Sequence, residues 1–215
     1  MKEIIRPLNV WLLQTGEPLH IDSNNPRPMR AMNLANALIE AGHNVVLWSS
    51  AFYHQEKRHR SNEFTSIMVN DNLEIRLIPS PGYQRNIGPK RLFDHAIMAQ
   101  NLKKYLTRID KLPDVAFIGY PPIEVAAIMG HWLQKNDVKY LIDVKDQWPT
   151  LFIDTIPGAF FKMIGRLILS PYYYYGKRAI REASGVCAMS LSFLNWANKF
   201  AGVSGSSKYD IITPL

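Results

Sequence analysis

Short apolar runs alternate with longer stretches of helical periodicity along this 215-residue chain. The apolar runs are typical of buried strands, and the periodic stretches are typical of helices with one buried face. The predicted strands cover residues 8–13, 44–50, 66–69, 73–78, 115–118, 139–144, 185–189 and 210–213. The predicted helices cover residues 28–40, 92–110, 123–135 and 192–200, together with a long amphipathic segment at 157–183 that is broken near Ser170 and Pro171.

This alternation predicts an α/β fold: a doubly wound, mainly parallel, Rossmann-like sheet with right-handed crossovers. The strands at 66–69 and 73–78 are separated by Asn70, Asp71 and Asn72, which favour a tight turn. Residues 202–207 are predicted to form a flexible connector because they are rich in glycine and serine. The residues between 51 and 62 are predicted to form a charged loop.

Composition narrows the class of protein and the kinds of partner. The chain is 47% hydrophobic and 20% charged, as expected for an ordered globular protein, and its single cysteine, Cys187, lies in an apolar run and is expected in the core. The net charge of +7 indicates either an anionic partner or only solubility. No basic block is interleaved with stackable aromatic residues, so nucleic acid is not an expected partner.

The sequence lacks the common motifs for nucleotide cofactors and for metal ions. The first turn lacks both the G-x-G-x-x-G pattern and a Walker lysine, so neither a standard dinucleotide site nor a P-loop is predicted. His54 and His59 lie in one loop with no cysteine nearby, so no metal site is predicted. We therefore expect no cofactor.

The strongest candidate site follows the strand at 139–144. Lys145, Asp146 and Trp148 come directly after an apolar run, at the carboxyl end of a strand, where open α/β sheets bind ligands. Asp146 is either a general base or hydroxyl acceptor, or a carboxylate that caps the loop. Trp148 either stacks on a sugar or fills the sheet edge. Tyr120, just after the strand at 115–118, is a further substrate-binding candidate.

The first loop offers a second candidate site. Gly16 and Glu17 follow the first strand, and Arg27 and Arg30 flank the start of the next helix. Helix starts favour anions, so the two arginines are candidates to hold a phosphate or carboxylate. The alternative is that they are solvated or that they pair with acidic residues such as Glu17 and Asp22.

The segment from 160 to 175 combines aromatic and basic residues. Phe160, Phe161, Lys162 and Arg166 have the composition of a helix that lies at a membrane interface, and the segment is too short and too charged to span a bilayer. The alternative is a core helix with a tyrosine-rich edge.

Two stretches of this chain resemble retaining glycosyltransferases of the GT-B class, family four. The first stretch runs from Thr15-Gly-Glu-Pro18 through the helix that ends in Ala41-Gly-His43 before an apolar strand. The second, Ile142-Asp-Val-Lys-Asp-Gln-Trp-Pro149, is similar to the "Arg-Asp-x-Trp-Pro" element of a subgroup that acts in lipopolysaccharide and capsule assembly. Relatives often have a histidine where this chain has Lys145, and two glycines in the first loop where it has only Gly16.

The resemblance implies a domain assignment and an activity. Residues 1–205 would form the N-terminal, acceptor-side domain of a GT-B enzyme, residues 206–215 would begin the interdomain linker with a last strand, and the C-terminal donor-binding domain would be absent. The complete enzyme would transfer a sugar from a nucleotide sugar to a polyprenyl-diphosphate-linked saccharide, with Asp146 as the catalytic residue. Gly16, Glu17, Arg27, Arg30, Tyr120, Lys145 and Trp148 would bind substrate.

The resemblance also implies a location and leaves rival readings open. The enzyme would be cytoplasmic, with the inner face of the plasma membrane as a further candidate partner through residues 160–166. The isolated chain would be inactive. The alternatives are a non-catalytic Rossmann-like module that binds a nucleotide or a partner, and one subunit of a split glycosyltransferase.

Overall fold

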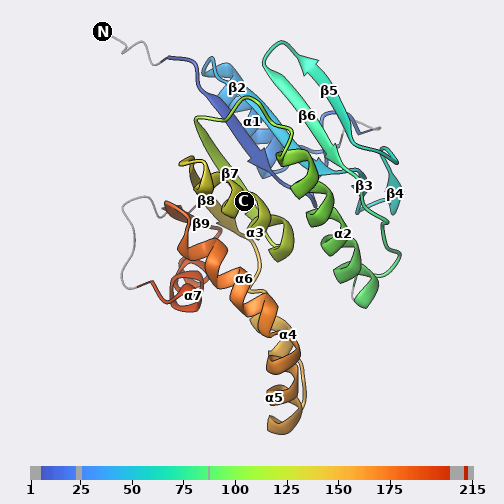
Figure 1. Cartoon of the computed structure of the whole chain (residues 1–215), viewed down its shortest axis with the longest axis vertical. Helices are drawn as coiled ribbons and strands as arrows, with labels where there is room; N and C mark the ends of the chain where they lie inside the picture. The colour runs from blue at the N-terminus through green and yellow to red at the C-terminus, as the bar shows by residue number, and fades with distance from the viewer. Residues whose placement is uncertain (1–5, 23–25, 87, 204–210, 213–215) are drawn as a thin grey trace. The chain divides into compact units, whose positions relative to one another are not determined.

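The computed structural model describes residues 6–22, 26–86, 88–203 and 211–212 (Figure 1). The chain divides into two compact units, residues 1–117 (unit 1) and 118–215 (unit 2), and the division falls within one strand, Val115–Tyr120. Each unit contains strands of the sheet with helices beside them.

Unit 1 contains the first strands and two helices. Its elements are β1 (Asn9–Leu13), α1 (Arg30–Glu40), β2 (Asn44–Ser50), β3 (Phe52–Tyr53), β4 (Arg58–His59), β5 (Thr65–Asn70), β6 (Leu73–Ile78) and α2 (Pro89–Leu106). The strand order is β1-β2-β6-β5, in which β1 and β6 are parallel to β2, and β5 is antiparallel to β6. The short strands β3 and β4 form a separate antiparallel pair.

The core of unit 1 lies where α1 packs on the sheet. Ala31 and Ala35 of α1 join a cluster of buried strand residues that includes Val10, Leu12 and Leu47. Alanines at these helix positions allow the helix backbone to approach the strands closely, and branched strand residues fill the pleated surface. This packing fixes α1 against the parallel strands of unit 1 and therefore positions the loop that precedes it.

Unit 2 contains the remaining elements. They are β7 (Val115–Tyr120), α3 (Ile123–Lys135), β8 (Lys139–Val144), α4 (Thr150–Asp154), α5 (Ala159–Ile168), α6 (Ser170–Arg181), β9 (Gly185–Ala188), α7 (Leu191–Ala201) and β10 (Ile211–Ile212). The strand order is β7-β8-β9-β10, and β9 pairs in parallel with both β8 and β10. Cys187 is a buried free thiol in β9, as the sequence predicted.

Two tyrosines fix α6 in unit 2. The Tyr140 hydroxyl of β8 donates a 2.8 Å hydrogen bond to the carbonyl of Ala179. A Cβ at Gly176 would lie 2.7 Å from the Tyr120 hydroxyl, so only glycine allows α6 to approach β7 this closely. The carboxyl end of β7 and the middle of α6 are therefore held as one packed group.

The predicted fold class is confirmed, and most predicted elements lie where the sequence indicated. The helix at 123–135 and the strand at 139–144 have the predicted bounds. The break near Ser170 separates α5 from α6. The prediction of a charged loop at 51–62 is wrong in part, because this segment contains the β3–β4 pair. The predicted connector beyond Val203, and residues 210 and 213 of the predicted last strand, lie outside the described residues.

Candidate functional site

The ends of β7 and β8 lie together in unit 2. The Lys145 amide donates a 2.9 Å hydrogen bond to the carbonyl of Tyr120, so the residues that follow both strands share one edge. Sequence reasoning placed Tyr120, Lys145 and Asp146 at this edge, and the structure brings them together. The carboxyl edge of a parallel sheet is the usual position of ligand sites in open α/β folds.

Lys145 has a carboxylate neighbour within the strand. Its ammonium lies 3.7 Å from Oδ2 of Asp143, whose side chain is only 1% exposed, whereas the Lys145 side chain is 21% exposed. A buried carboxylate is stabilised by a nearby cation, so this pairing gives Asp143 a structural role. Lys145 therefore links a buried charge to the surface of the edge, and Asp146, which follows it, is half-buried.

Tyr120 and Trp148 are internal parts of this edge. Tyr120 is fully buried, and its hydroxyl donates a 2.6 Å hydrogen bond to the carbonyl of Trp148. Burial raises the pKa of Tyr120 well above its usual value, so the hydroxyl stays protonated and remains a donor. The Trp148 ring is 5% exposed and packs on Phe152, with 4.4 Å between ring centroids. Of the two roles that the sequence allowed, this packing is the one in which Trp148 fills the sheet edge.

The first loop of unit 1 holds Gly16 and Glu17. Gly16 is exposed, its carbonyl accepts from Nε2 of Gln55 at 2.9 Å, and a side chain there would meet no described atom within 4 Å. The buried Glu17 carboxylate accepts from the Ala31 amide at 2.8 Å and from Nε2 of Gln14 at 2.9 Å. Glu17 therefore caps the start of α1 with the protein's own negative charge.

The two arginines near α1 differ in exposure. Arg27 is exposed, and Arg30 is half-buried as the first residue of α1. The sequence offered Asp22 as a pairing partner for these arginines, but in the structure Asp22 forms a double hydrogen bond with Arg60, at 2.7 and 2.6 Å. That pairing was missed because Arg60 is 38 residues further along the chain.

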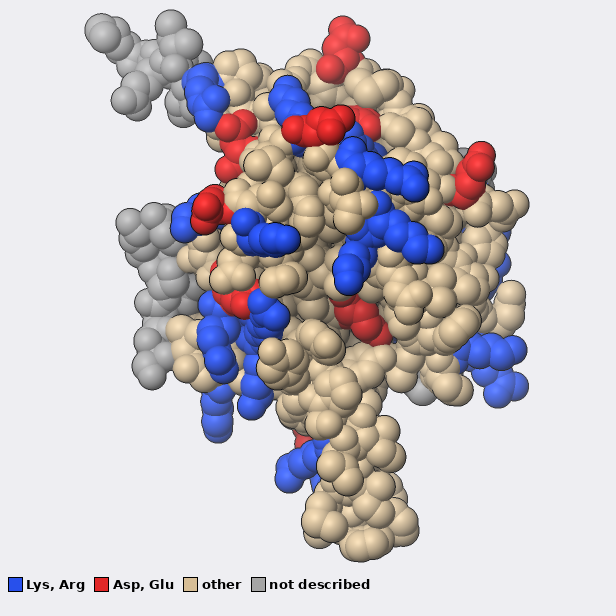
Figure 2. All heavy atoms as spheres, in the orientation of Figure 1, with Lys and Arg blue, Asp and Glu red and all other residues tan. Residues whose placement is uncertain are grey.

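The surface of α5 is apolar. None of its ten residues is buried, and Phe160, Phe161 and Leu167 are 63%, 62% and 75% exposed. In Figure 2 the surface at the lower end of the view, where Figure 1 shows α5, is almost entirely tan, with basic atoms at one side. The alternative of a core helix is therefore wrong for α5. No helix in the described part of the chain is both long enough and apolar enough to cross a membrane.

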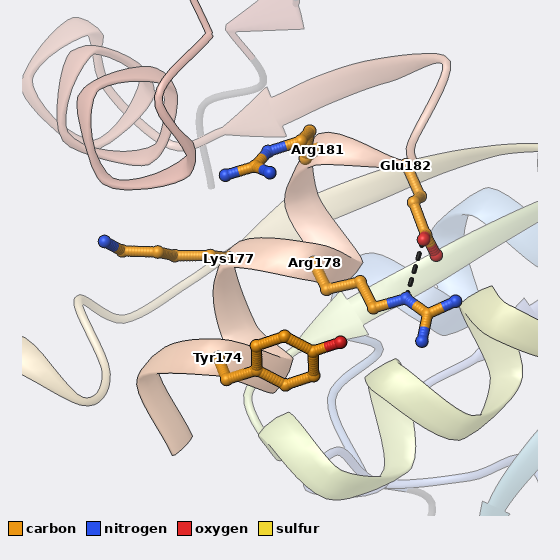
Figure 3. Close-up of a pocket in the computed structure, with 5 residues that line it drawn as sticks. All are labelled: Tyr174, Lys177, Arg178, Arg181 and Glu182. Atoms are coloured by element: carbon orange, nitrogen blue, oxygen red, sulfur yellow. Dashed lines mark hydrogen bonds and ion pairs between the residues drawn. The ribbon is translucent and has the colours of Figure 1, made fainter. Parts of the chain in front are cut away.

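A groove of about 270 Å³ lies along α6 (Figure 3). Its lining residues are Tyr174, Lys177, Arg178, Arg181 and Glu182. Two of its cations are engaged within the protein: Arg178 donates to Glu182 at 2.6 Å and to His131 at 2.8 Å, and Arg181 donates to the carbonyl of Ala201 at 3.1 Å. The groove is thus basic, but both of its arginines already form hydrogen bonds within the protein.

Sequence reasoning missed a group of residues in unit 1 around Tyr83. His54 and Lys57 come from the β3–β4 connection, and Arg91 comes from the first turn of α2. Residues 51–62, which contain His54 and Lys57, are predicted from the sequence to form a charged loop, but nothing in the sequence shows that this segment and the start of α2 meet. The signal available was that they follow β2 and β6, which are neighbouring strands. Within the described residues, no set of three or more His, Cys, Asp or Glu side chains is arranged to hold a metal ion.

Comparison with known proteins shows the fold. No protein-family model and no curated protein matches the chain. Among solved structures, sucrose-phosphate synthase from Thermosynechococcus elongatus matches with a TM-score of 0.56 at 12% identity, over 96% of this chain and 88% of that one. This similarity supports a Rossmann-like domain of the GT-B kind.

Two further structures match at lower scores. MurG from Acinetobacter baumannii has a TM-score of 0.47 at 14% identity, and the match covers 96% of this chain and 46% of that one. Starch synthase IV from Arabidopsis thaliana has a TM-score of 0.44 at 10% identity, and the match covers 66% of this chain and 34% of that one. Each of these two matches covers less than half of the other structure.

Proposed function

We propose that this chain is the acceptor-side, N-terminal part of a glycosyltransferase in surface polysaccharide synthesis. The enzyme would transfer a sugar from a nucleotide sugar to a saccharide carried on polyprenyl diphosphate, with retained anomeric configuration. The donor would bind to a second Rossmann-like domain outside these 215 residues. The fold match to sucrose-phosphate synthase supports this class of activity.

The observation that carries the proposal is the edge formed by β7 and β8. The 2.9 Å hydrogen bond from Lys145 to Tyr120 fixes the backbone that presents Asp146. A half-buried carboxylate at this position is suited to accept a hydrogen bond from an acceptor hydroxyl and to orient it. During transfer, the bond between the sugar and the nucleoside diphosphate would break, the acceptor oxygen would form the new glycosidic bond, and the proton of the acceptor hydroxyl would pass to the departing diphosphate.

Of the other predicted residues, some are proposed to contact substrate and the rest to support the site from within the protein. We assign Lys145, Arg27 and Arg30 to anionic groups of the substrate, and exposed Gly16 to a close approach of substrate to the first loop. Glu17, Tyr120 and Trp148 act as positioning residues, because each is at most 5% exposed and is hydrogen-bonded or packed within its own unit.

A lipid-linked acceptor requires access to a membrane surface, and α5 offers a suitable element. Its exposed apolar residues, including Phe160 and Phe161, would enter the interfacial region, and Lys162 and Arg166 would face anionic headgroups. The protein would then work in the cytoplasm, at the inner face of the plasma membrane.

Ligand binding to the 215-residue chain tests the proposal. We expect a polyprenyl-diphosphate-linked saccharide in detergent micelles to raise the melting temperature, and nucleotide sugars to leave it unchanged. The Asp146→Asn variant should lose part of the acceptor response, and Asp154→Asn, at an exposed position on α4, should retain it. Stabilisation by nucleotides alone would instead identify a nucleotide-binding module.

A further inference from the structure

Basic side chains from two segments of unit 1 gather around Tyr83. The Lys57 ammonium lies 4.7 Å from the centroid of the Tyr83 ring, and the Arg91 guanidinium carbon lies 5.7 Å from it. Nδ1 of His54 lies 2.7 Å from the Tyr83 hydroxyl. We call His54, Lys57, Tyr83 and Arg91 the Tyr83 cluster.

The backbone around the cluster is fixed by close packing. Gly82 has φ +77°, and a Cβ there would lie 2.7 Å from the ring of Phe52 in β3. The Gly82 amide donates a 2.6 Å hydrogen bond to Asp94 of α2. The loop before α2 is thus held between the β3–β4 pair and α2, and Figure 1 shows this loop passing beside that pair.

Hydrogen bonds determine how the cluster presents its donors. Lys57 donates to Nδ1 of His54 at 3.1 Å, and an ammonium group can only donate, so Nδ1 is an acceptor. The proton of the neutral ring is therefore on Nε2, which is a donor. Lys57 also donates to Oδ1 of Asn86 at 2.5 Å, and Arg91 donates to the carbonyl of Asn86 at 2.9 Å.

The positive groups of the cluster repel one another. Burial, followed by Lys57 and Arg91, lowers the pKa of His54. Burial and then Arg91 lower the pKa of Lys57. The nearby carboxylate of Asp94 is buried and accepts a hydrogen bond from the Gly82 amide. Burial raises the pKa of Asp94, so its negative charge only partly offsets the positive field of the cluster. A protein that holds cations close together in this way has a site suited to an anion.

Two further features of the backbone point the same way. Lys57 adopts φ +53°, a left-handed conformation that costs a non-glycine residue free energy and that often marks a functional position. The 18-residue helix α2 begins beside the cluster, with Pro89 in its first turn, and its N-cap residue, Gly88, has no side chain that could cap it. Its positive end therefore adds to the field of the basic groups.

We propose that the Tyr83 cluster binds a phosphate or diphosphate group. The half-buried Lys57 and Arg91 would supply the charge, Nε2–H of His54 and the start of α2 would supply directed donors, and the buried Tyr83 would hold the cations in place. If the proposed function holds, the ligand is the diphosphate that links the acceptor saccharide to its polyprenyl chain.

The groove along α6 is the rival anion site, and its geometry is less suitable. Arg178 is paired with Glu182 and Arg181 with a helix-end carbonyl, so anion binding there would require these bonds to break. In the Tyr83 cluster, Lys57 is hydrogen-bonded to neutral groups of His54 and Asn86. Binding at the cluster therefore breaks no ion pair of Lys57 with another described residue.

Titration of the 215-residue chain with inorganic pyrophosphate, at constant ionic strength, tests the site. We expect saturable binding that weakens at least tenfold in Lys57→Gln and in Arg91→Gln. Lys103→Gln and Arg108→Gln make the same change of net charge at exposed positions near the far end of α2 and should alter the dissociation constant less than twofold. Equal weakening in all four variants, or no binding by the parent chain at millimolar pyrophosphate, would overturn the proposal.

A milder variant covers the case in which the charge variants fail to fold. Tyr83→Phe removes only the hydroxyl that bonds to His54, and we expect a threefold or greater weakening with an amide spectrum that remains dispersed. If neither the Lys57→Gln nor the Arg91→Gln variant folds, and Tyr83→Phe binds pyrophosphate with the affinity of the parent chain, the proposed site is contradicted.

The source of the diphosphate is resolved by competition. We expect polyprenyl diphosphate in detergent micelles to displace pyrophosphate, and polyprenol in the same detergent not to do so. A nucleoside diphosphate that binds more tightly than pyrophosphate, with the same loss in Arg91→Gln, would confirm the anion site but would contradict the acceptor-side assignment. The two proposals can therefore fail separately.

Discussion

The Tyr120 hydroxyl lies between two parts of unit 2 that are far apart in the sequence. It donates a 2.6 Å hydrogen bond to the carbonyl of Trp148, and it occupies the space where a Cβ of residue 176 would lie, 2.7 Å away. One buried oxygen thus fixes both the loop after β8 and the approach of α6. The proposed catalytic Asp146 is two residues before Trp148, so this oxygen also supports the candidate site.

We expect Tyr120→Phe to lower the free energy of unfolding by about 1–2 kcal/mol, because it leaves the buried carbonyl of Trp148 without this donor. Gly176→Ala should cost about 1–3 kcal/mol, since the new methyl group meets the hydroxyl. The double variant should cost less than the sum, because removal of the hydroxyl makes room for the methyl group. Urea denaturation of all four proteins measures this coupling, and strict additivity would contradict it.

The buried ion pair of Arg60 and Asp22 is expected to dominate the stability of the first loop. Both side chains are almost fully buried, at 3% and 1% exposure, and Arg60 also donates to the carbonyl of Ser50 at 2.9 Å. Arg60→Met should cost about 3–5 kcal/mol, since it leaves a buried carboxylate without its cation.

The exposed pair of Arg58 and Glu56 provides the matched comparison for Arg60. These side chains are each 40% exposed, so Arg58→Met should change the free energy of unfolding by less than about 1 kcal/mol. Similar costs for the two variants, measured by urea denaturation, would show that burial does not control the strength of the Arg60 pair.

The sequence predicted the helices and strands better than it predicted the contacts between distant segments. Local periodicity determines whether a segment such as 123–135 or 139–144 is a helix or a strand, and both were predicted with the observed bounds. The order of residues along the chain also placed Lys145 and Asp146 at the end of a strand. Contacts between distant segments carry no such local signal. The pairing of Arg60 with Asp22, and the gathering of Lys57 and Arg91 around Tyr83, depend on which strands are neighbours.

The exposure of α5 could not be predicted for a related reason. An amphipathic pattern shows that a helix has an apolar face, but it does not show what covers that face. Tyr120 and Trp148 illustrate the reverse case. Their positions at strand ends suggested contact with a ligand, whereas the structure uses both residues for internal packing.

His95 is expected to make the stability of the chain sensitive to acid. Burial, followed by the charges of Arg91 and His54, lowers its pKa from 6.5 to about 3. A depressed histidine pKa stabilises the folded state fully above pH 6.5, and this contribution is lost progressively as the pH falls from there toward about 3. Between pH 7.5 and pH 5.0 the loss amounts to about 2 kcal/mol, at ~1.4 kcal/mol for each pH unit below 6.5.

The His95→Asn variant tests this source of acid sensitivity. His54 has a pKa lowered in the same direction and remains in the variant, so the comparison must be between the parent chain and the variant at each pH. We expect the free energy of unfolding to fall by about 2 kcal/mol less in His95→Asn over this range. Parallel pH profiles for the two proteins would show that His95 is not the source.

The α5 surface is expected to bind anionic vesicles. Phe161→Ser combined with Leu167→Ser should weaken sedimentation with phosphatidylglycerol vesicles at least tenfold, because both side chains are more than half exposed and would enter the interface. Lys162→Gln with Arg166→Gln should weaken binding mainly at low salt, where charges are least screened. Met68→Ser, at a 62% exposed position on the edge strand β5, is the control and should have no effect.

Asp146 gives the most direct test of the proposed chemistry. In the complete enzyme, Asp146→Ala should lower the turnover number at least tenfold, because the carboxylate would no longer orient the acceptor hydroxyl. Asp154→Ala, at an exposed position eight residues later along the chain, removes the same group outside the edge and should leave turnover within twofold. Rates are compared at saturating donor and acceptor, so that weaker binding does not imitate a catalytic effect. An unchanged turnover number in Asp146→Ala, with folded protein, would remove this residue from the mechanism.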